Sequence, residues 1–329
     1  MNFKTTPKVE LHLHIEGGAP PAFIRGLAKE KHVDIGGIFN EDGSYRFADF
    51  WDFLKVYEAA TTVLQSPQDF YRLTLAVLEQ SAESGVIYSE CFISPDFCGG
   101  RDLIAWREYL HAIEEAAAKA ETDFGITLRG IVTAIRHFGP DKARETAACA
   151  AETTGRFITG FGIGGDEKSG KLQDFAWSFD MAREAGLRLT AHAGEWGGPE
   201  AVREALSLGV ERIGHGVRAI EDLALVDEIA ERGVVLEVCP GSNVALGLYP
   251  NFRAHPISEL FNRGAKVTVS TDDPPFFHTT MEREYEMLHR AFEWDEAVFA
   301  KLARTSIEAA FCDADTQKRI LTKLEQANG

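Results

Sequence analysis

The chain has 329 residues, 45% of them hydrophobic and 26% charged, which is an ordinary composition for a globular protein with a large buried core. Its formal net charge of -17 disfavours nucleic acid or an anionic membrane as the main partner, because both repel an acidic surface. The sequence shows no apolar signal core, no membrane-length apolar run, and no CxxC pairing among its five cysteines. We therefore expect a cytoplasmic protein with reduced thiols.

Short β-rich runs alternate along the chain with longer amphipathic stretches. The predicted strands are 9–16, 86–94, 126–135, 157–165, 187–195, 212–216, 234–242 and 266–274. Eight strand–helix units without a break in composition predict an α/β protein, a (β/α)8 TIM barrel forming a single domain over 1–329. An open doubly wound sheet is the alternative, but no GxGxxG follows the first strand. The segment 20–66 is too long for one loop, so we expect extra helices inserted after strand 1 at the barrel mouth.

The first predicted strand, in "VELHLHIEGG", alternates apolar residues with Glu10, His12, His14 and Glu16. Because successive strand residues point to opposite faces, one face carries only carboxylates and imidazoles. An amphipathic edge strand facing water would give the same pattern. In a barrel, however, the polar face would point inward and the apolar face would meet the helices.

Other polar residues fall at the ends of later predicted strands. They are Asp166, Glu167, His192, Glu195, His215, Asn243, Asp272 and Asp273. Because the carboxyl ends of barrel strands meet at one face, we expect these side chains to converge there with His12 and His14.

A divalent metal is the simplest partner for buried imidazole and carboxylate groups, which are costly to bury alone. His12 and His14, two residues apart on one strand face, form the first pair of candidate ligands, and His192 and Asp272 would complete the set. Imidazole nitrogens with one carboxylate suit one zinc ion with an open coordination position. A satisfied core or surface residue is the alternative for each histidine taken singly. His137 is expected to have a structural or supporting role, and no role is predicted for His32, His111, His255, His278 and His289.

Zinc would supply hydroxide from water near neutral pH. Glu195 lies three residues beyond His192, where its carboxylic acid could protonate a substrate ring nitrogen, and His215 could hold the hydroxide. A stabilising acid at the N-terminus of the next helix is the alternative interpretation of Glu195.

At these residues the sequence resembles the adenosine deaminase family of zinc aminohydrolases. The matching motifs, in the family's order, are "PKVELHLHIEG", "GDE" at 165–167, "HAGE" at 192–195, "RIGHG" at 212–216, "CPGSN" at 239–243 and "STDDP" at 270–274. The resemblance implies a (β/α)8 barrel with one zinc ion that hydrolyses the 6-amino group of a small-molecule purine.

The resemblance also implies residue roles. The metal ligands would be His12, His14, His192 and Asp272, and the catalytic residues would be Glu195 as proton shuttle to purine N1, His215 and Asp272. The substrate would be contacted by His14, Glu16, Gly165 at N3, Asp273 at N7, and the lid aromatics Phe53 and Tyr57. Packing of the helix against the core is the alternative for these two aromatics.

Glu16 departs from adenosine-specific members of the family, which usually carry Asp at this position to contact the ribose. "LHLHIEG" resembles the adenine and aminofutalosine deaminases, whereas "GGDE" at 164–167 resembles the nucleoside-acting members. We expect adenosine, with 2′-deoxyadenosine, to be the substrate, and adenine or a modified adenine nucleoside such as aminofutalosine is the alternative.

Three rival functions fit the sequence less well. A two-metal amidohydrolase commonly needs a lysine at the end of strand 4, where this chain has Gly164-Gly165-Asp166. A cytidine-deaminase fold would need H-x-E with P-C-x-x-C, and neither occurs at usable spacing. A non-catalytic metal-binding barrel would have no need of Glu195.

Overall fold

The computed structural model describes residues 1–327, and eight parallel strands in them pair in chain order. The strands are β1 (Lys8–His14), β2 (Val86–Ile93), β3 (Thr127–Ile135), β4 (Ile158–Gly164), β5 (Arg188–Ala193), β6 (Arg212–His215), β7 (Val235–Val238) and β8 (Lys266–Val269). Just beyond β8, the N–H of Asp272 donates to the carbonyl of His12 at 3.1 Å and the N–H of His14 donates to the carbonyl of Asp272 at 3.0 Å. These two bonds nearly close the barrel, which confirms the predicted (β/α)8 fold.

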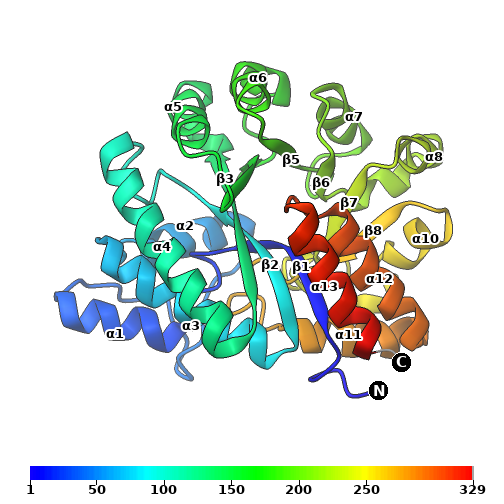
Figure 1. The fold of residues 1–329 in the computed structure, drawn as a ribbon, viewed down its shortest axis with the longest axis horizontal. Coiled ribbons are helices and arrows are strands. Elements are labelled where there is room, and N and C mark those ends of the chain that lie inside the picture. Colours follow the sequence, from blue (N-terminus) through cyan, green and yellow to red (C-terminus); the bar gives the residue numbers. More distant parts are fainter. Residues whose placement is uncertain (328–329) are drawn as a thin grey trace.

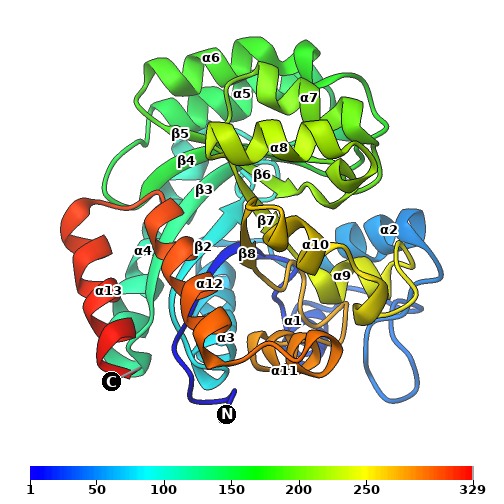
Figure 2. The ribbon, with the colours of Figure 1, turned by 90° about the vertical axis from the view of Figure 1, so that its right-hand side faces the viewer.

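Helices surround the strands on the outside (Figure 1). The helices of the described chain are α1 (Pro21–Lys31), α2 (Phe50–Thr61), α3 (Pro67–Glu83), α4 (Leu103–Phe124), α5 (Pro140–Ala151), α6 (Ala176–Glu184), α7 (Pro199–Ser207), α8 (Leu223–Arg232), α9 (Pro240–Ala245), α10 (Ile257–Asn262), α11 (Met281–Phe292), α12 (Glu296–Ala309) and α13 (Ala314–Ala327). Short 3₁₀ turns are η1 (Arg136–Phe138), η2 (Leu172–Phe175), η3 (Val217–Glu221) and η4 (Phe252–Ala254). Figure 2 shows α5 to α8 lying together over β3 to β6.

The predicted insertion after the first strand consists of α1 and α2. Asp49 begins α2 by accepting the N–H of Asp52 with its side chain, which satisfies one of the free donors of the first turn. The buried face of α2 includes Phe53 and Val56. α2 belongs to the insertion between β1 and α3 and is not one of the helices that pack around the outside of the barrel. Its side chains instead line the pocket at the carboxyl ends of the strands.

The first strand divides its faces as predicted. Val9 and Leu11 pack against Ala303 and Ile307 of α12 and Ile320 of α13 on the outside of the barrel. The polar side chains of the same strand are buried on the inside, where Glu10 accepts hydrogen bonds from Thr271 and His12 bonds to Glu237.

All eight strands are somewhat shorter than predicted, and β7 and β8 differ most. β7 ends at Val238 because Pro240 begins α9, and β8 ends at Val269. Beyond β8, Asp272 has a φ of 67°, a left-handed conformation that no regular strand contains. The motifs "CPGSN" and "STDDP" therefore follow the ends of β7 and β8 and are not part of the strands. None of the helices within residues 1–327 has both the length and the apolar character that crossing a membrane requires.

Candidate active site

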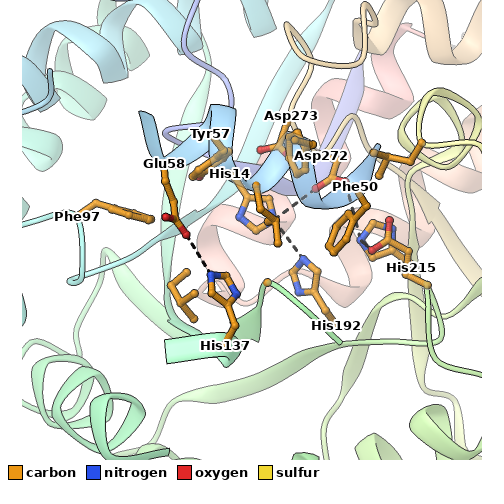
Figure 3. A pocket seen from close by; sticks show the side chains of 16 residues that line it. His14, Phe50, Tyr57, Glu58, Phe97, His137, His192, His215, Asp272 and Asp273 are labelled. Atoms are coloured by element: carbon orange, nitrogen blue, oxygen red, sulfur yellow. Dashed lines mark hydrogen bonds and ion pairs between the residues drawn. The ribbon is translucent and has the colours of Figure 1, made fainter. Parts of the chain in front are cut away.

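A pocket opens at the carboxyl ends of the strands (Figure 3). One wall consists of polar groups from the strand ends, namely His14, His192, Glu195, His215, Asp272 and Asp273. The opposite wall is largely apolar and comes from α2 and neighbouring loops, with Phe50, Phe53, Leu54, Tyr57, Phe97 and Leu246. The convergence predicted from strand ends far apart in the sequence therefore occurs.

Four of the predicted residues form one cluster. The ligand atoms of His12, His14, His192 and Asp272 all lie within 4.8 Å of one another. Oδ1 of Asp272 is 3.4 Å from Nε2 of His12 and 3.4 Å from Nε2 of His14, and the Nε2 atoms of His14 and His192 are 3.2 Å apart. Three imidazole nitrogens and one carboxylate at this spacing are a donor set that fits one divalent metal ion such as zinc.

The histidine rings are held with Nε2 toward the centre of this cluster. Nδ1 of His12 bonds to the Glu237 carboxylate at 2.8 Å, and Nδ1 of His192 bonds to the carbonyl of Ile163 at 2.9 Å. A ligating histidine commonly donates its other ring N–H to such an acceptor, which fixes the tautomer. Nε2 of His12 is buried without a hydrogen-bond partner. A metal ion would supply the partner that this atom lacks.

Glycines make room for the rings. A Cβ on Gly214 of β6 would lie 2.8 Å from Cε1 of His12, and a Cβ on Gly164 of β4 would lie 3.2 Å from Cε1 of His192. A larger residue at either inward position would displace a ring of the cluster.

The backbone is strained at two of these side chains. His215 has a φ of 60° and Asp272 a φ of 67°, and both residues are buried. Non-glycine residues in this region cost free energy and are concentrated at functional sites. The left-handed turns end β6 and follow β8, and they place both side chains over the barrel mouth.

Glu195 lies above this cluster in an environment that favours its protonated form. Its side chain is buried, and burial together with the neighbouring Asp272 carboxylate raises the pKa of Glu195 well above its usual range. Oε2 of Glu195 is 3.8 Å from Nε2 of His215, and that Nε2 is 3.9 Å from Oδ2 of Asp272. Hence a carboxylic acid, a neutral imidazole and a carboxylate face the same small space.

The loop that carries Glu195 is fixed by Glu167. The buried carboxylate of Glu167 accepts the backbone N–H groups of Gly194, Glu195, Trp196 and Gly197. Four bonds from one carboxylate set the position of the loop just before α7. This is a role for the "GDE" motif that the sequence did not reveal.

Asp273 and Gly165 also line the pocket. Burial and the adjacent Asp272 raise the pKa of Asp273 well above its usual range, and Oδ1 of Asp273 is buried without a partner. Gly165 has a φ of 90°, and a Cβ there would lie 2.7 Å from Nδ1 of His137. Glycine is therefore required at this position for two reasons, conformation and space.

The two predicted lid aromatics, Phe53 and Tyr57, both line the pocket. The Tyr57 hydroxyl donates to Oε2 of Glu16 at 3.2 Å, and Glu16 itself is buried and does not line the pocket. Next to them, Nε2 of His137 bonds to Oε1 of Glu58 at 3.2 Å, which ties α2 to the end of β3 (Figure 3). His137 thus has the supporting position that the sequence suggested.

Sequence reasoning missed the polar network beneath the cluster. Glu237 bonds not only to His12 but also to Arg212, and Arg212 pairs with Glu90; all of these side chains are buried. The available signal was a charged residue inside an apolar strand, as in "VVLEV" and "VIYSECF". His255, for which no role was predicted, is also buried and bonds to Asn243 beside Glu195.

Fold and site together define a (β/α)8-barrel hydrolase. The chain belongs to the adenosine deaminase family, because the family model described as adenosine deaminase matches residues 7–327. It is thus a hydrolytic deaminase that acts on a small purine, and the resemblance seen in the sequence is confirmed.

Individual relatives match over almost their whole length. An adenine deaminase of Agrobacterium fabrum is 45% identical over 97% of this chain and 98% of that protein. One of Rhizobium leguminosarum bv. trifolii is 46% identical over 96% of this chain and 98% of that protein. The crystal structure of an adenine deaminase from Arthrobacter aurescens has a TM-score of 0.90 and 34% identity, and covers 98% of this chain and 99% of that one. An amidohydrolase from Burkholderia ambifaria with bound Zn has a TM-score of 0.87 and 26% identity, over 99% of this chain and 92% of that one.

Proposed function

We propose that this protein hydrolyses adenine to hypoxanthine and ammonia, with one zinc ion held by His12, His14, His192 and Asp272. The relatives named adenine deaminase, at 45% and 46% identity over nearly the whole chain, support adenine. The sequence led us to expect adenosine, with adenine as the alternative, and these relatives favour the alternative.

The walls of the pocket support the same choice. Glu16 occupies the position at which the resemblance implies a ribose contact, yet its carboxylate does not line the pocket and accepts a hydrogen bond from the Tyr57 hydroxyl. The Glu58–His137 pair lies at the same pocket. In this proposal, the sugar of a nucleoside would extend toward these side chains and compete with them for space, whereas a free base would not.

The chemistry follows from groups on the polar wall. Zinc, when bound, supplies hydroxide from water near neutral pH. Glu195 gives its proton to N1 of the purine as hydroxide adds to C6, and His215 orients the attacking oxygen. The proton of the new C6 hydroxyl then passes to the 6-amino group, the C6–N6 bond breaks and ammonia leaves. The proton from Glu195 stays on N1 of the 6-oxo product, and the proton that water lost in forming hydroxide returns to Glu195.

Asp273 and Gly165 orient the ring in this proposal. The raised pKa of Asp273 keeps a proton on its carboxyl, which can donate a hydrogen bond to N7. The backbone of Gly165 would meet N3 on the other edge. A planar ring held at both edges between His14 and the α2 aromatics presents C6 to the cluster.

The test is to identify the products and the metal requirement. Purified protein incubated with adenine should yield hypoxanthine and ammonia in equal amounts. Chelation should abolish this activity, and zinc should restore it. Full activity in demonstrably metal-free protein would overturn the metal mechanism, and conversion of adenosine without conversion of adenine would overturn the proposed substrate.

A further inference from the structure

Two buried polar residues, Asn243 and His255, lie beside the reacting groups without belonging to the metal cluster. Nδ2 of Asn243 is 3.4 Å from Oε1 of Glu195 and 3.4 Å from Nδ1 of His215. On its other side, Oδ1 of Asn243 is 3.1 Å from Nε2 of His255. Asn243 is fully buried and His255 is 3% exposed, so water does not compete for these bonds.

One backbone N–H group sets the direction of each hydrogen bond in the series that runs from His255 through Asn243 to Glu195 and His215. The N–H of Ile257 can only donate, and it donates to Nδ1 of His255 at 3.1 Å. Burial lowers the pKa of His255 to about 3, so the imidazole is neutral and carries its single proton on Nε2. His255 therefore donates to Oδ1 of Asn243, which turns the amide NH₂ toward Glu195 and His215.

The orientation of the Asn243 amide determines which atoms of His215 and Glu195 carry a proton. Because Nδ1 of His215 accepts from Asn243, this nitrogen carries no proton, and the N–H of the ring is therefore at Nε2. That atom faces the space between Oε2 of Glu195, at 3.8 Å, and Oδ2 of Asp272, at 3.9 Å. Oε1 of Glu195 accepts from Asn243, so Oε2 is the oxygen left to carry the acidic proton into the same space.

We propose that Asn243 and His255 are positioning residues that fix the tautomer of His215 and select the oxygen of Glu195 that holds the transferable proton. The proposal rests on the deaminase function proposed above. It assigns a reaction-related role to the Asn of "CPGSN" and to a histidine in the loop between η4 and α10.

The first test is Asn243→Asp, which keeps the shape and the acceptor for His255 but removes the donor to Glu195 and His215. We expect kcat for adenine to fall about 10²- to 10³-fold, the cost typical of removing one positioned donor, with KM and zinc content little changed. Asn251→Asp is the matched control, because Asn251 is exposed and caps η4, and it should retain full activity. An Asn243→Asp enzyme as active as wild type would overturn the proposal.

The second test compares two replacements of His255. Gln can keep the donor to Asn243, whereas Leu has similar bulk and no donor. We expect His255→Gln to keep kcat within about 3-fold of wild type and His255→Leu to lose at least about tenfold. Equal loss in both variants would mean that His255 only fills space, and would contradict the assigned role.

A measurement without substrate separates this proposal from the proposed function. ¹⁵N NMR of the zinc-loaded protein should show His215 with its proton on Nε2 in the wild type and in His255→Gln, and a mixed or reversed tautomer in Asn243→Asp. If the wild type does not convert adenine but these signatures appear, the positioning role stands and the substrate is wrong. A His215 tautomer that is unchanged in Asn243→Asp overturns the positioning role, whatever the activity. This readout does not depend on the stability of the His255→Leu variant.

Discussion

Glu237 accepts a hydrogen bond from Nδ1 of His12 at 2.8 Å, from below the cluster, although 225 residues separate the two in the chain. The same carboxylate pairs with Arg212, so the metal cluster rests on a buried ionic network of the barrel interior. If the four-residue cluster holds zinc as proposed, we expect its affinity to depend on Glu237, which is not itself one of the four proposed ligands.

Replacing Glu237 by Gln should therefore weaken zinc binding about 10- to 100-fold, the usual effect of losing the partner of a ligating histidine. The amide would also face Arg212 with a donor, so the thermal midpoint should fall as well. Competition with a chromophoric chelator measures the zinc affinity. The exposed Glu231→Gln on α8 is the control, and equal affinities in the two variants would contradict the role of Glu237.

Replacing Glu195 by Gln should lower kcat for adenine by at least about 10²- to 10⁴-fold, because the amide has no acidic proton to transfer. Zinc content should stay at one ion per chain, since Glu195 is not a member of the four-residue cluster. Steady-state kinetics and metal analysis on the same sample check the fall in kcat and the unchanged zinc content. Glu200→Gln, on the exposed surface of α7, should behave as wild type. Substantial residual turnover in Glu195→Gln would identify a different proton donor.

Gly214→Ala should prevent zinc from binding to the cluster of His12, His14, His192 and Asp272. The added methyl would lie 2.8 Å from Cε1 of His12 and 3.2 Å from Nδ1 of His192, and neither ring can move without breaking its hydrogen bond. We expect loss of zinc and of activity. Gly26→Ala is the matched control, because a Cβ at this position in α1 meets nothing within 4 Å, and it should stabilise the protein by about 0.5–1 kcal/mol. Full zinc content in Gly214→Ala would show that the barrel adjusts around the methyl.

Glu284 should make the protein less stable at alkaline pH. Burial raises the pKa of Glu284 to about 8 in the folded protein, from an ordinary value of 4.5. The folded state therefore binds the proton more tightly, and this stabilisation, complete below pH 4.5, is lost as the pH rises through 8. The free energy of unfolding should decline by about 1.4 kcal/mol per pH unit from this group between those limits.

Glu284→Gln should flatten that decline. A Gln side chain can still accept from the N–H of Gly241 and bond to the Thr279 hydroxyl, but it has no proton to lose. Denaturant unfolding at pH 5, 7 and 9 compares the two proteins. As the pH rises, the free energy of unfolding of Glu284→Gln should increase relative to that of the wild type. Parallel pH profiles of the two proteins would show that Glu284 does not titrate in this range.

The sequence predicted the parts of the site that lie at strand ends. His12, His14, His192 and Asp272 could be placed together because barrel topology brings all such ends to one face. Their roles as metal ligands stay predictions until metal is measured.

The supporting groups could not be predicted in the same way. Glu237 acts through contacts between strands that no local pattern encodes, and His255 lies in a loop whose position depends on the whole fold. Glu167 was expected at a strand end, but its bonds to the loop of Glu195 could not be predicted. The position of Glu16 is another example. The substrate contact that the resemblance implies for Glu16 stays a prediction, whereas its hydrogen bond from the Tyr57 hydroxyl depends on how α2 docks and could not be predicted.

The central claim is best tested by the ratio of kcat/KM for adenine to kcat/KM for adenosine, measured side by side on the zinc-loaded enzyme, with 2′-deoxyadenosine and an aminofutalosine-type nucleoside in the same series. We expect adenine to be preferred by more than about tenfold, because relatives at 45% and 46% identity are named adenine deaminase and because, in our proposal, a sugar on N9 would compete for space with Tyr57 and the Glu58–His137 pair. A preference for any of the nucleosides would contradict the account.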